Sequence, residues 1–262
     1  MLTEARNEFK AIHLSIKYAL QREMLNKFTF LSNVILMILN NASFIIQWII
    51  LFSIREDIGG YDMKKVLMLW AIAALTYGIS RFFFISSFDL SDSINKGKLD
   101  NYILMPKNVL LSLITSNIEV SAIGDIIYGV GLIAIIDYTK LPLFILTSIF
   151  GALIITAIAV IYGSLAFFFG RAEIIADTVN NIMTNFSTYP EGIFKAGVKT
   201  VFYTILPLGL STYIPVKLLC EFNLELFLIL IGGTILFTTL AFLIFYKGLK
   251  RYSSTNLMNA RV

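Results

Sequence analysis

The stretch from Leu141 to Gly170 constrains this chain most, because its thirty residues include no Asp, Glu, Lys, Arg or His. About twenty apolar residues in a helix, rising about 1.5 Å each, are enough to cross the hydrocarbon core of a bilayer. The stretch therefore predicts a membrane-spanning helix. Because 57% of all residues are hydrophobic and only 15% are charged, most of the surface should face lipid or other helices. This composition argues against a soluble enzyme or a nucleic-acid-binding protein.

Further apolar segments predict an all-α polytopic membrane protein with six transmembrane helices. The predicted spans, within a transmembrane domain at 28–246, are residues 28–54, 66–88, 109–136, 141–170, 173–189 and 226–246. Between the last two spans, residues 190–222 contain Pro207 and Pro215. Proline interrupts helices, and loose backbone is tolerated at membrane depth only where protein buries it. We therefore expect a broken, partly re-entrant element before the last span.

The two ends of the chain are polar or amphipathic. Residues 1–27 predict an amphipathic helix, which either lies in the lipid headgroups or is a plain lead-in helix packed on the protein. Residues 247–262 form a basic tail. Six spans place both termini on one side, and that side carries fourteen of the 21 Lys and Arg residues. The excess of basic residues predicts that both termini lie on the cytoplasmic side of a cell membrane. The net charge of +4 is therefore interpreted as a sign of membrane orientation, with lipids as neighbours, and a nucleic-acid partner is not expected.

The sequence offers few groups for metal binding or catalysis. Cys220 is its only cysteine and His13 its only histidine. A disulfide within the chain, a thiolate metal cluster and a His-based catalytic triad in the membrane are therefore excluded. We expect no metal site and no catalytic residue.

The polar connector at 89–108, between the second and third predicted spans, is the first candidate for function. It contains GKLDNYILMP from Gly97 to Pro106. Gly97 is expected to end a helix in a left-handed conformation, and Pro106 to begin the next element. Apolar residues in an otherwise charged loop suit either docking into a groove of a cytosolic partner or resting on headgroups.

Polar residues inside the predicted spans form the second candidate. They recur at steps of four on one face of the fifth span, at Glu173, Asp177, Asn181 and Asn185. Because burying charge in a bilayer is costly, we expect this stripe to line the substrate path or an interface between subunits. Alternatively, the two acidic residues simply favour the positive N-terminal end of the helix.

Two carboxylates and an outer aromatic cluster complete the candidates. Glu119 and Asp125, six residues apart, do not share a helix face. Each is expected to meet a polar partner on a neighbouring helix, with a place in the substrate path or subunit interface as the alternative. Tyr189, Pro190 and Phe194 are expected to shape the outer re-entrant element, either as a gate or as packing against the last span.

Three features together resemble the permease subunits of type-2 ATP-binding-cassette (ABC) exporters. One is GKLDNYILMP after the second span, and another is YPEGIF before a proline-broken apolar segment. The third is the tail GLKRYSSTNLMNARV, which is similar to the Gly–basic–Tyr–Ser ending of a bacterial branch with paired permeases. The resemblance covers nearly the whole chain.

The resemblance implies a permease that forms the substrate path and couples to separate ABC ATPase subunits. It implies a second permease chain, identical or related, and a coupling helix within 89–105, with loop 171–173 as a smaller contact. The coupling residues it implies are Asp89, Asp92, Gly97, Leu99, Asp100, Tyr102 and Pro106. The chain has no GxxxxGK[ST] phosphate loop. ATP and Mg²⁺ are therefore expected on the partner ATPase, with no cofactor on this chain.

Two other functions are weighed against ATP-driven export. A secondary transporter or channel, working without an ATPase, would need coupled charges in the membrane and often has inverted repeats around broken helices. The sequence offers one broken segment and no matching partner. An intramembrane enzyme would need a convergent set of catalytic groups, which this sequence does not supply. Substrate identity is beyond the reach of these patterns.

Overall fold

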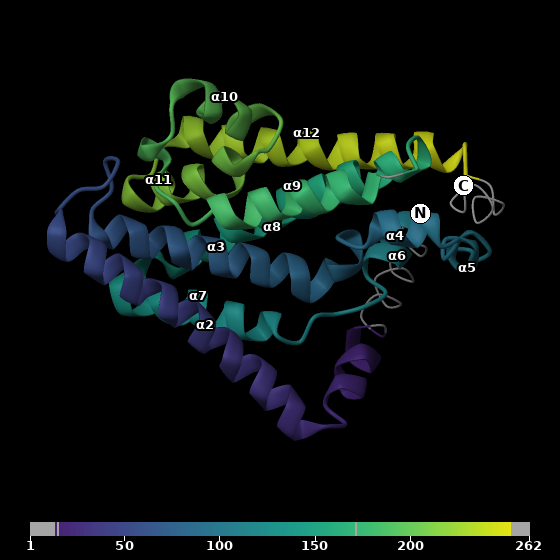
Figure 1. Ribbon diagram of the computed structural model, residues 1–262, viewed down its shortest axis with the longest axis horizontal. Helices are drawn as coiled ribbons and strands as arrows, with labels where there is room; N and C mark the ends of the chain where they lie inside the picture. The colour runs from purple at the N-terminus through teal and green to yellow at the C-terminus, as the bar shows by residue number, and fades with distance from the viewer. Residues whose placement is uncertain (1–13, 15, 171, 253–262) are drawn as a thin grey trace.

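The computed structural model describes residues 14, 16–170 and 172–252, most of which are helical and none of which lies in a β-strand (Figure 1). The predicted N-terminal helix lies largely, and the predicted tail partly, outside the described residues. The longer helices are α2 (Lys27–Ile54), α3 (Met63–Phe84), α7 (Ala122–Asp137), α8 (Leu141–Gly163), α9 (Ala172–Phe186) and α12 (Leu224–Leu249). The shorter ones are η1 (Ile85–Ser87), α4 (Leu90–Asn95), α5 (Asp100–Ile103), α6 (Val109–Ile114), η2 (Tyr138–Lys140), η3 (Ser164–Phe167), η4 (Glu191–Ile193), α10 (Ala196–Thr204), η5 (Gly209–Tyr213) and α11 (Ile214–Cys220).

Helix α3 lies at the centre of the bundle. It packs against α2, α7, α8 and α11. Nearly all of its residues from Val66 to Gly78 are buried, and no charged residue stands between Lys65 and Arg81. A helix that is apolar on every side suits the interior of a bundle or the lipid of a membrane. The sequence of α3 is therefore compatible with the central position that the fold gives it.

Four helical stretches among the described residues are long and apolar enough to cross a membrane. One of them, Ala122–Phe167, has 46 residues, which is far more than a single crossing needs. Its first helix, α7, runs antiparallel to α3. A Cβ built on Gly129 would meet Leu75, whereas one built on Gly78 would meet Ile126.

The second helix of this stretch, α8, runs parallel to α3. A Cβ built on Gly151 would meet Thr76, and the hydroxyl groups of Ser80 and Thr156 lie 2.8 Å apart. Since α7 and α8 run in opposite directions, the chain reverses at η2. The 46-residue stretch therefore makes two passes through the bundle, as the separate predicted spans require.

The prediction of one continuous span over 109–136 is wrong. The structure has two helices there, α6 and α7, separated by a non-helical segment at 115–121. At the break the Thr115 hydroxyl bonds a backbone carbonyl one turn back, and the hydroxyl groups of Ser86 and Ser116 lie 3.0 Å apart. The Ser86 contact holds the non-helical segment against η1, and the Thr115 bond is one that continuous helices also contain, as at Thr156 of α8.

The predicted span at 173–189 corresponds to α9, which has 15 residues and is not among the helices long enough to cross a membrane. It is amphipathic. Its buried stripe comprises Ala172, Ala176, Val179 and Met183. The small alanines let α9 lie close to α8 and α4. By length, then, the described helices give four candidate spans and one broken pair.

The broken element forms as its prolines predict. Helix α10 and the unit formed by η5 and α11 are bent by 85° relative to each other. Pro207 lies in the break, and every residue from Leu206 to Val216, Pro215 included, is buried. The irregular backbone is therefore enclosed by protein, the condition under which a membrane protein tolerates it.

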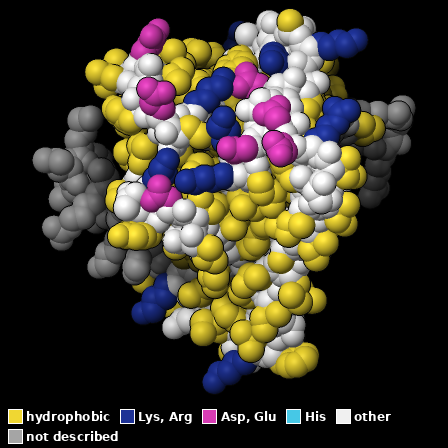
Figure 2. Space-filling model, turned by 90° about the vertical axis from the view of Figure 1, so that its left-hand side faces the viewer, with side chains coloured by type: hydrophobic (Ala, Val, Ile, Leu, Met, Phe, Trp, Pro, Cys, Tyr) yellow, Lys and Arg dark blue, Asp and Glu magenta, His cyan; other side chains and the backbone are white. Residues whose placement is uncertain are grey.

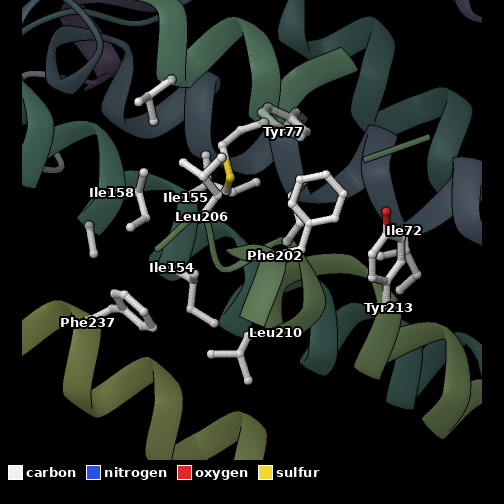
Figure 3. Close-up of a cluster of buried hydrophobic side chains, with 14 of the residues drawn as sticks. Ile72, Tyr77, Ile154, Ile155, Ile158, Phe202, Leu206, Leu210, Tyr213 and Phe237 are labelled. Carbon is white, nitrogen blue, oxygen red and sulfur yellow. The ribbon is translucent and has the colours of Figure 1, made fainter. Parts of the chain in front are cut away.

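The core beside the broken element is apolar. Figure 3 shows Ile154 of α8, Leu210 of η5 and Phe237 of α12 lying close to one another. Ile154 is completely buried, as is Tyr213 on η5. Within a membrane such packing stabilises the fold through close van der Waals contact between helices. This packing joins the broken element to α8 and α12.

The molecule has two distinct ends. The connector with α4, α5 and α6 lies at the same end as the C-terminus of α12, and α10, α11 and the α2–α3 loop lie at the other (Figure 1). Figure 2 looks onto this second end, where acidic and basic side chains gather above the apolar surface. Polar ends around an apolar middle are the pattern of a membrane-embedded bundle.

Candidate functional site

A cavity of about 360 Å³ opens between α2, α3, α7 and α9. Its wall combines aromatic rings, amides, hydroxyl groups and two ionisable side chains. The lining residues are Met37, Asn40, Asn41, Phe44, Gln47, Trp48, Leu51, Trp70, Ala73, Ala74, Tyr77, Arg81, Asp125, Thr184, Asn185, Ser187, Thr188 and Tyr189. Such a mixture of apolar surface and a few polar groups is typical of small-molecule sites.

Aromatic rings form the apolar part of the wall. Phe44 of α2 stacks on Trp70 of α3, with ring centroids 5.2 Å apart and an interplanar angle of 25°. Trp48 meets the edge of Tyr189, with centroids 6.1 Å apart. Both tryptophans are buried. Because these rings pack on one another, they present a fixed, flat apolar surface to the cavity.

Asp125 supplies the acidic group of the wall and also ties two helices together. The Asn41 amide nitrogen on α2 donates a 2.5 Å hydrogen bond to its carboxylate on α7. Both side chains are buried. The prediction that Asp125 meets a polar partner on a neighbouring helix is thus confirmed. The bond matters for α2, since little of its apolar stretch is buried in the protein.

Arg81 supplies the basic group at the end of α3. Its guanidinium lies 3.7 Å from the Glu119 carboxylate and 5.8 Å from the centroid of the Phe88 ring. Glu119 also accepts a 2.7 Å hydrogen bond from the Ser121 hydroxyl. Glu119 therefore has the neighbouring-helix partner that was predicted, although it lies in the break before α7.

The polar stripe on α9 faces away from the core of the chain. Glu173, Asp177, Asn181 and Asn185 are all exposed, because the buried stripe of α9 lies on the other side of the helix. Of these four, Asn185 lines the cavity. The role of the stripe in a substrate path or an interface stays a prediction.

The connector folds back onto the bundle through two short helices. Gly97 has a φ of +71°, so it ends α4 in the left-handed conformation that the sequence predicts. Leu90, Ile94 and Leu99 are completely buried. Leu99 therefore holds the connector in place and has no surface to offer a partner in this conformation.

The charged residues of the connector lie at its surface. Asp92 forms ion pairs with Lys96 at 2.7 Å and Lys98 at 3.2 Å. The Asp92 carboxylate raises the pKa of Lys96. Asp89 is exposed and Asp100 partly exposed. Asp92, Lys96 and Lys98 are therefore paired within the connector itself.

The tip of the connector is apolar and exposed. Leu104 is 86% exposed, and Ile103 and Met105 on either side are exposed as well. Tyr102 is half-buried against the core. The expectation that Pro106 begins the next element is wrong, because α6 begins at Val109. There the side chain of Asn108 accepts a 2.9 Å hydrogen bond from the backbone of Leu111 and caps the helix.

The C-terminal end of α12 reaches the connector. Burial raises the pKa of the Tyr252 hydroxyl to about 12, and the charge of Asp100 on α5 acts in the same direction. The Arg251 guanidinium lies over the Phe168 ring, 5.1 Å from its centroid. Residue 171 of the predicted second contact, loop 171–173, lies outside the described residues.

The outer cluster is packed around the broken element. Tyr189 lines the cavity, Pro190 is buried, and Phe194 contacts the Phe202 ring at 5.0 Å between centroids. Nearby, Lys217 lies 2.7 Å from the Glu191 carboxylate. These contacts support packing, and a gating role for Tyr189, Pro190 and Phe194 stays a prediction.

Sequence reasoning missed the aromatic wall and Arg81. Trp48 and Trp70 lie near the ends of their predicted spans, where tryptophan commonly meets lipid headgroups. Their inward position depends on how α2 and α3 pack, which periodicity alone does not give. Among the described residues, no three His, Cys, Asp or Glu side chains are placed to hold a metal ion.

The long apolar helices and the enclosed broken element define a multi-pass membrane protein, with an amphiphilic cavity between its helices. The chain belongs to the ABC-2 family transporter proteins, whose family model matches residues 37–256. It is therefore a permease of a type-2 ABC transporter, a family that implies an ABC ATPase partner. No curated protein and no solved structure matches the chain.

Proposed function

We propose that this chain is the membrane subunit of an ATP-driven exporter and that the connector at 89–108 is its contact with the ATPase. The connector combines buried anchors with an exposed apolar tip at Ile103, Leu104 and Met105. This combination is the observation that carries the proposal. The tip offers a docking surface. The buried residues Leu90, Ile94 and Leu99 fix the connector to the bundle, so movement of the tip would move the helices that they contact.

The path from the tip leads to the helices around the cavity. Helix α4 contacts α8, η3 and α9. A Cβ built on Gly163 of α8 would lie 2.8 Å from the Leu90 Cβ, so the two elements already touch closely. Movement of the connector would pass to α8 and α9, and α9 contributes to the cavity wall. ATP binding and hydrolysis, with Mg²⁺, would occur on the partner ATPase.

The proposed arrangement has six passes, with α9 as the fifth and the bent pair re-entering from the outer side. The protein would lie in the cell membrane, with both termini on the cytoplasmic side. A second permease chain would cover α2 and the polar stripe of α9. Exposure of Asp177 and Asn181 supports this pairing, because polar groups at membrane depth need protein or water around them. The cavity would then form part of the substrate path.

Co-purification with a co-expressed ABC ATPase encoded beside this chain tests the proposal. Leu104→Glu places a charge on the exposed tip and should abolish the complex. Leu224→Glu is the matched control, because Leu224 is also exposed but lies at the first turn of α12, at the opposite end. The control should retain the complex. Equal retention by both variants would refute the docking surface, and ATP-independent export by the chain alone would refute the proposed energy source.

A further inference from the structure

The outer face of α12 changes from apolar to basic along its length. Its side chains recur at steps of three and four residues, which places them on one side of a helix. They are all exposed, and they are Leu236, Leu240, Leu243, Lys247 and Lys250. The buried residues of α12 lie on the other side, where the helix packs against α8 and η3. The exposed residues therefore form one continuous stripe with an apolar part and a basic end.

The cations at the basic end of the stripe have no acidic partner. Lys247, Lys250 and the adjacent Arg251 are exposed, and none of them forms an ion pair with another described residue. Residues 253–262 contain no Asp or Glu. The connector at the same end of the molecule differs, because its Lys96 and Lys98 are both paired with Asp92. The basic end of α12 thus keeps a positive charge that an anion can meet.

The Arg251 side chain is held by the segment that follows α8. Its guanidinium lies 5.1 Å from the centroid of the Phe168 ring, directly after η3. Gly248 allows η3 to come this close to α12, because a Cβ at that position would lie 2.3 Å from the Phe167 ring. Contact with an aromatic ring attracts a cation without cancelling its charge. At least one cation of the basic end is therefore positioned beside an aromatic surface.

We propose that the stripe binds an anionic phospholipid from the leaflet on the connector side. The phosphate would meet Lys247, Lys250 and Arg251, and an acyl chain would lie along the leucines. From Leu236 to Lys247 the helix rises about 16 Å, which is roughly half of the ~30 Å hydrocarbon core of a bilayer. The apolar part of the stripe therefore matches the depth of one leaflet. Basic residues beside a membrane-spanning helix attract anionic headgroups in this way.

The two ends of α12 differ in charge, which favours an anion at one end only. The first turn of the helix contains the exposed Glu225 and no Lys or Arg. Zwitterionic lipid suits the apolar part equally well, so selection for an anionic lipid comes from the basic end alone.

The stripe stays open to lipid in the proposed complex. Figure 1 shows α2 along one edge of the bundle and α12 along the opposite edge. A second permease chain that docks on α2 therefore approaches from the other side. The proposal goes beyond the proposed function, since it requires only that the bundle lies in a membrane.

Native mass spectrometry of the purified full chain tests the proposal, because it resolves the chain with and without a bound lipid. The chain in neutral detergent is titrated with dioleoyl phosphatidylglycerol, which is anionic, and with dioleoyl phosphatidylcholine, which has the same acyl chains and no net charge. Phosphatidylglycerol should bind at least about tenfold more tightly than phosphatidylcholine. An excess of sn-glycerol 3-phosphate, which carries the phosphate without acyl chains, should not displace it.

Two double variants test the location of the site. Lys247→Gln/Lys250→Gln removes two cations of the stripe and should weaken phosphatidylglycerol binding at least about tenfold. Lys96→Gln/Lys98→Gln is the matched control, because it removes the same charge at the same end of the molecule from residues that are already paired. The control should change the affinity less than about twofold. Equal losses in the two variants would show a response to net charge and would overturn the assignment to α12.

The other outcomes also decide the proposal. Equal affinity for phosphatidylglycerol and phosphatidylcholine would overturn it, since the cations would then select no headgroup. Displacement by glycerol phosphate would show a site for a free phosphate anion and would overturn the lipid as occupant. The titration uses the chain without an ATPase, so failure of the ATPase complex would refute the proposed function and leave this result unchanged.

Discussion

At the scale of single residues, the hydrogen bond between Asn41 and Asp125 ties α2 to α7. Helix α2 contacts α7 and α3, and much of its surface is exposed. Between apolar surfaces in a membrane the hydrophobic effect gives little preference for one contact over another, so a buried polar pair fixes position more effectively. The cavity wall depends on this placement, because α2 provides Phe44 and Trp48.

Replacing one member of the Asn41–Asp125 pair should destabilise the protein. Asn41→Leu leaves the Asp125 carboxylate without its donor and should lower the free energy of unfolding by about 1–3 kcal/mol. The double variant Asn41→Leu/Asp125→Leu should recover most of that loss, because no buried polar group is left unpaired. Thermal melting in detergent measures the difference, with Asn40→Leu, an exposed neighbour, as control. A double variant as unstable as the single one would contradict the account.

Close backbone contact at the outer end also predicts that position 192 must be glycine. The α2–α3 loop lies against η4 so closely that a Cβ on Gly192 would collide with the backbone of Gly59. Gly192→Ala should therefore separate the two loops and lower the melting temperature. Gly197→Ala has open space around its Cβ and should not. Melting curves of both variants make the comparison, and a neutral Gly192→Ala would contradict the described packing.

At the scale of elements, the long helices were predictable and the breaks only partly so. Spans at 28–54, 66–88, 141–170 and 226–246 follow from long apolar runs, of which 66–88 alone contains a charged residue, Arg81, and such runs have few alternatives in a membrane. Pro207 predicted the broken element, because proline interrupts a helix. The break after α6 carries no proline. The segment that follows α6 contacts η1 through Ser116 and Ser86, which are 30 positions apart, so local pattern does not reveal this contact.

Some features of the candidate site were likewise predictable from the sequence, whereas others required the fold. Partners for Glu119 and Asp125 were expected because buried charge needs a partner, but their identities, Arg81 and Asn41, required the fold. The left-handed Gly97 follows from local chemistry. The burial of Leu99 does not, since an apolar residue in a polar connector can face either the bundle or a partner. The cavity itself arises from four helices and has no local signature.

The contact between α4 and α8 should carry force from the connector. Gly163→Val would push against Leu90 and shift α4 away from α8. We expect this variant to retain the ATPase complex but to lose at least about half of its ATP-driven transport per ATP hydrolysed. Gly131→Val, whose Cβ position is open, is the control. Reconstituted vesicles measure both rates, and unchanged coupling in Gly163→Val would contradict the proposed path.

At the scale of the whole molecule, the account requires the connector and the broken element to lie on opposite sides of the membrane. The single cysteine makes this testable, since Cys220 is exposed at the end of α11. A membrane-impermeant thiol reagent should label it in intact cells. In the Cys220→Ser/Leu104→Cys variant, labelling should require permeabilised cells. Gel shifts measure both reactions, and the reverse pattern would invert the proposed orientation.

The central claim is that the exposed tip of the connector is the surface on which the ATPase acts. Thiol cross-linking tests it most directly, in a chain with Cys220→Ser and Leu104→Cys and a co-expressed ATPase bearing single cysteines near its membrane-facing surface. The account predicts a cross-linked product whose yield changes when ATP is bound, and none when the cysteine is placed at Leu224 instead. Absence of cross-linking at position 104 in an intact complex, or equal cross-linking at both positions, would contradict it.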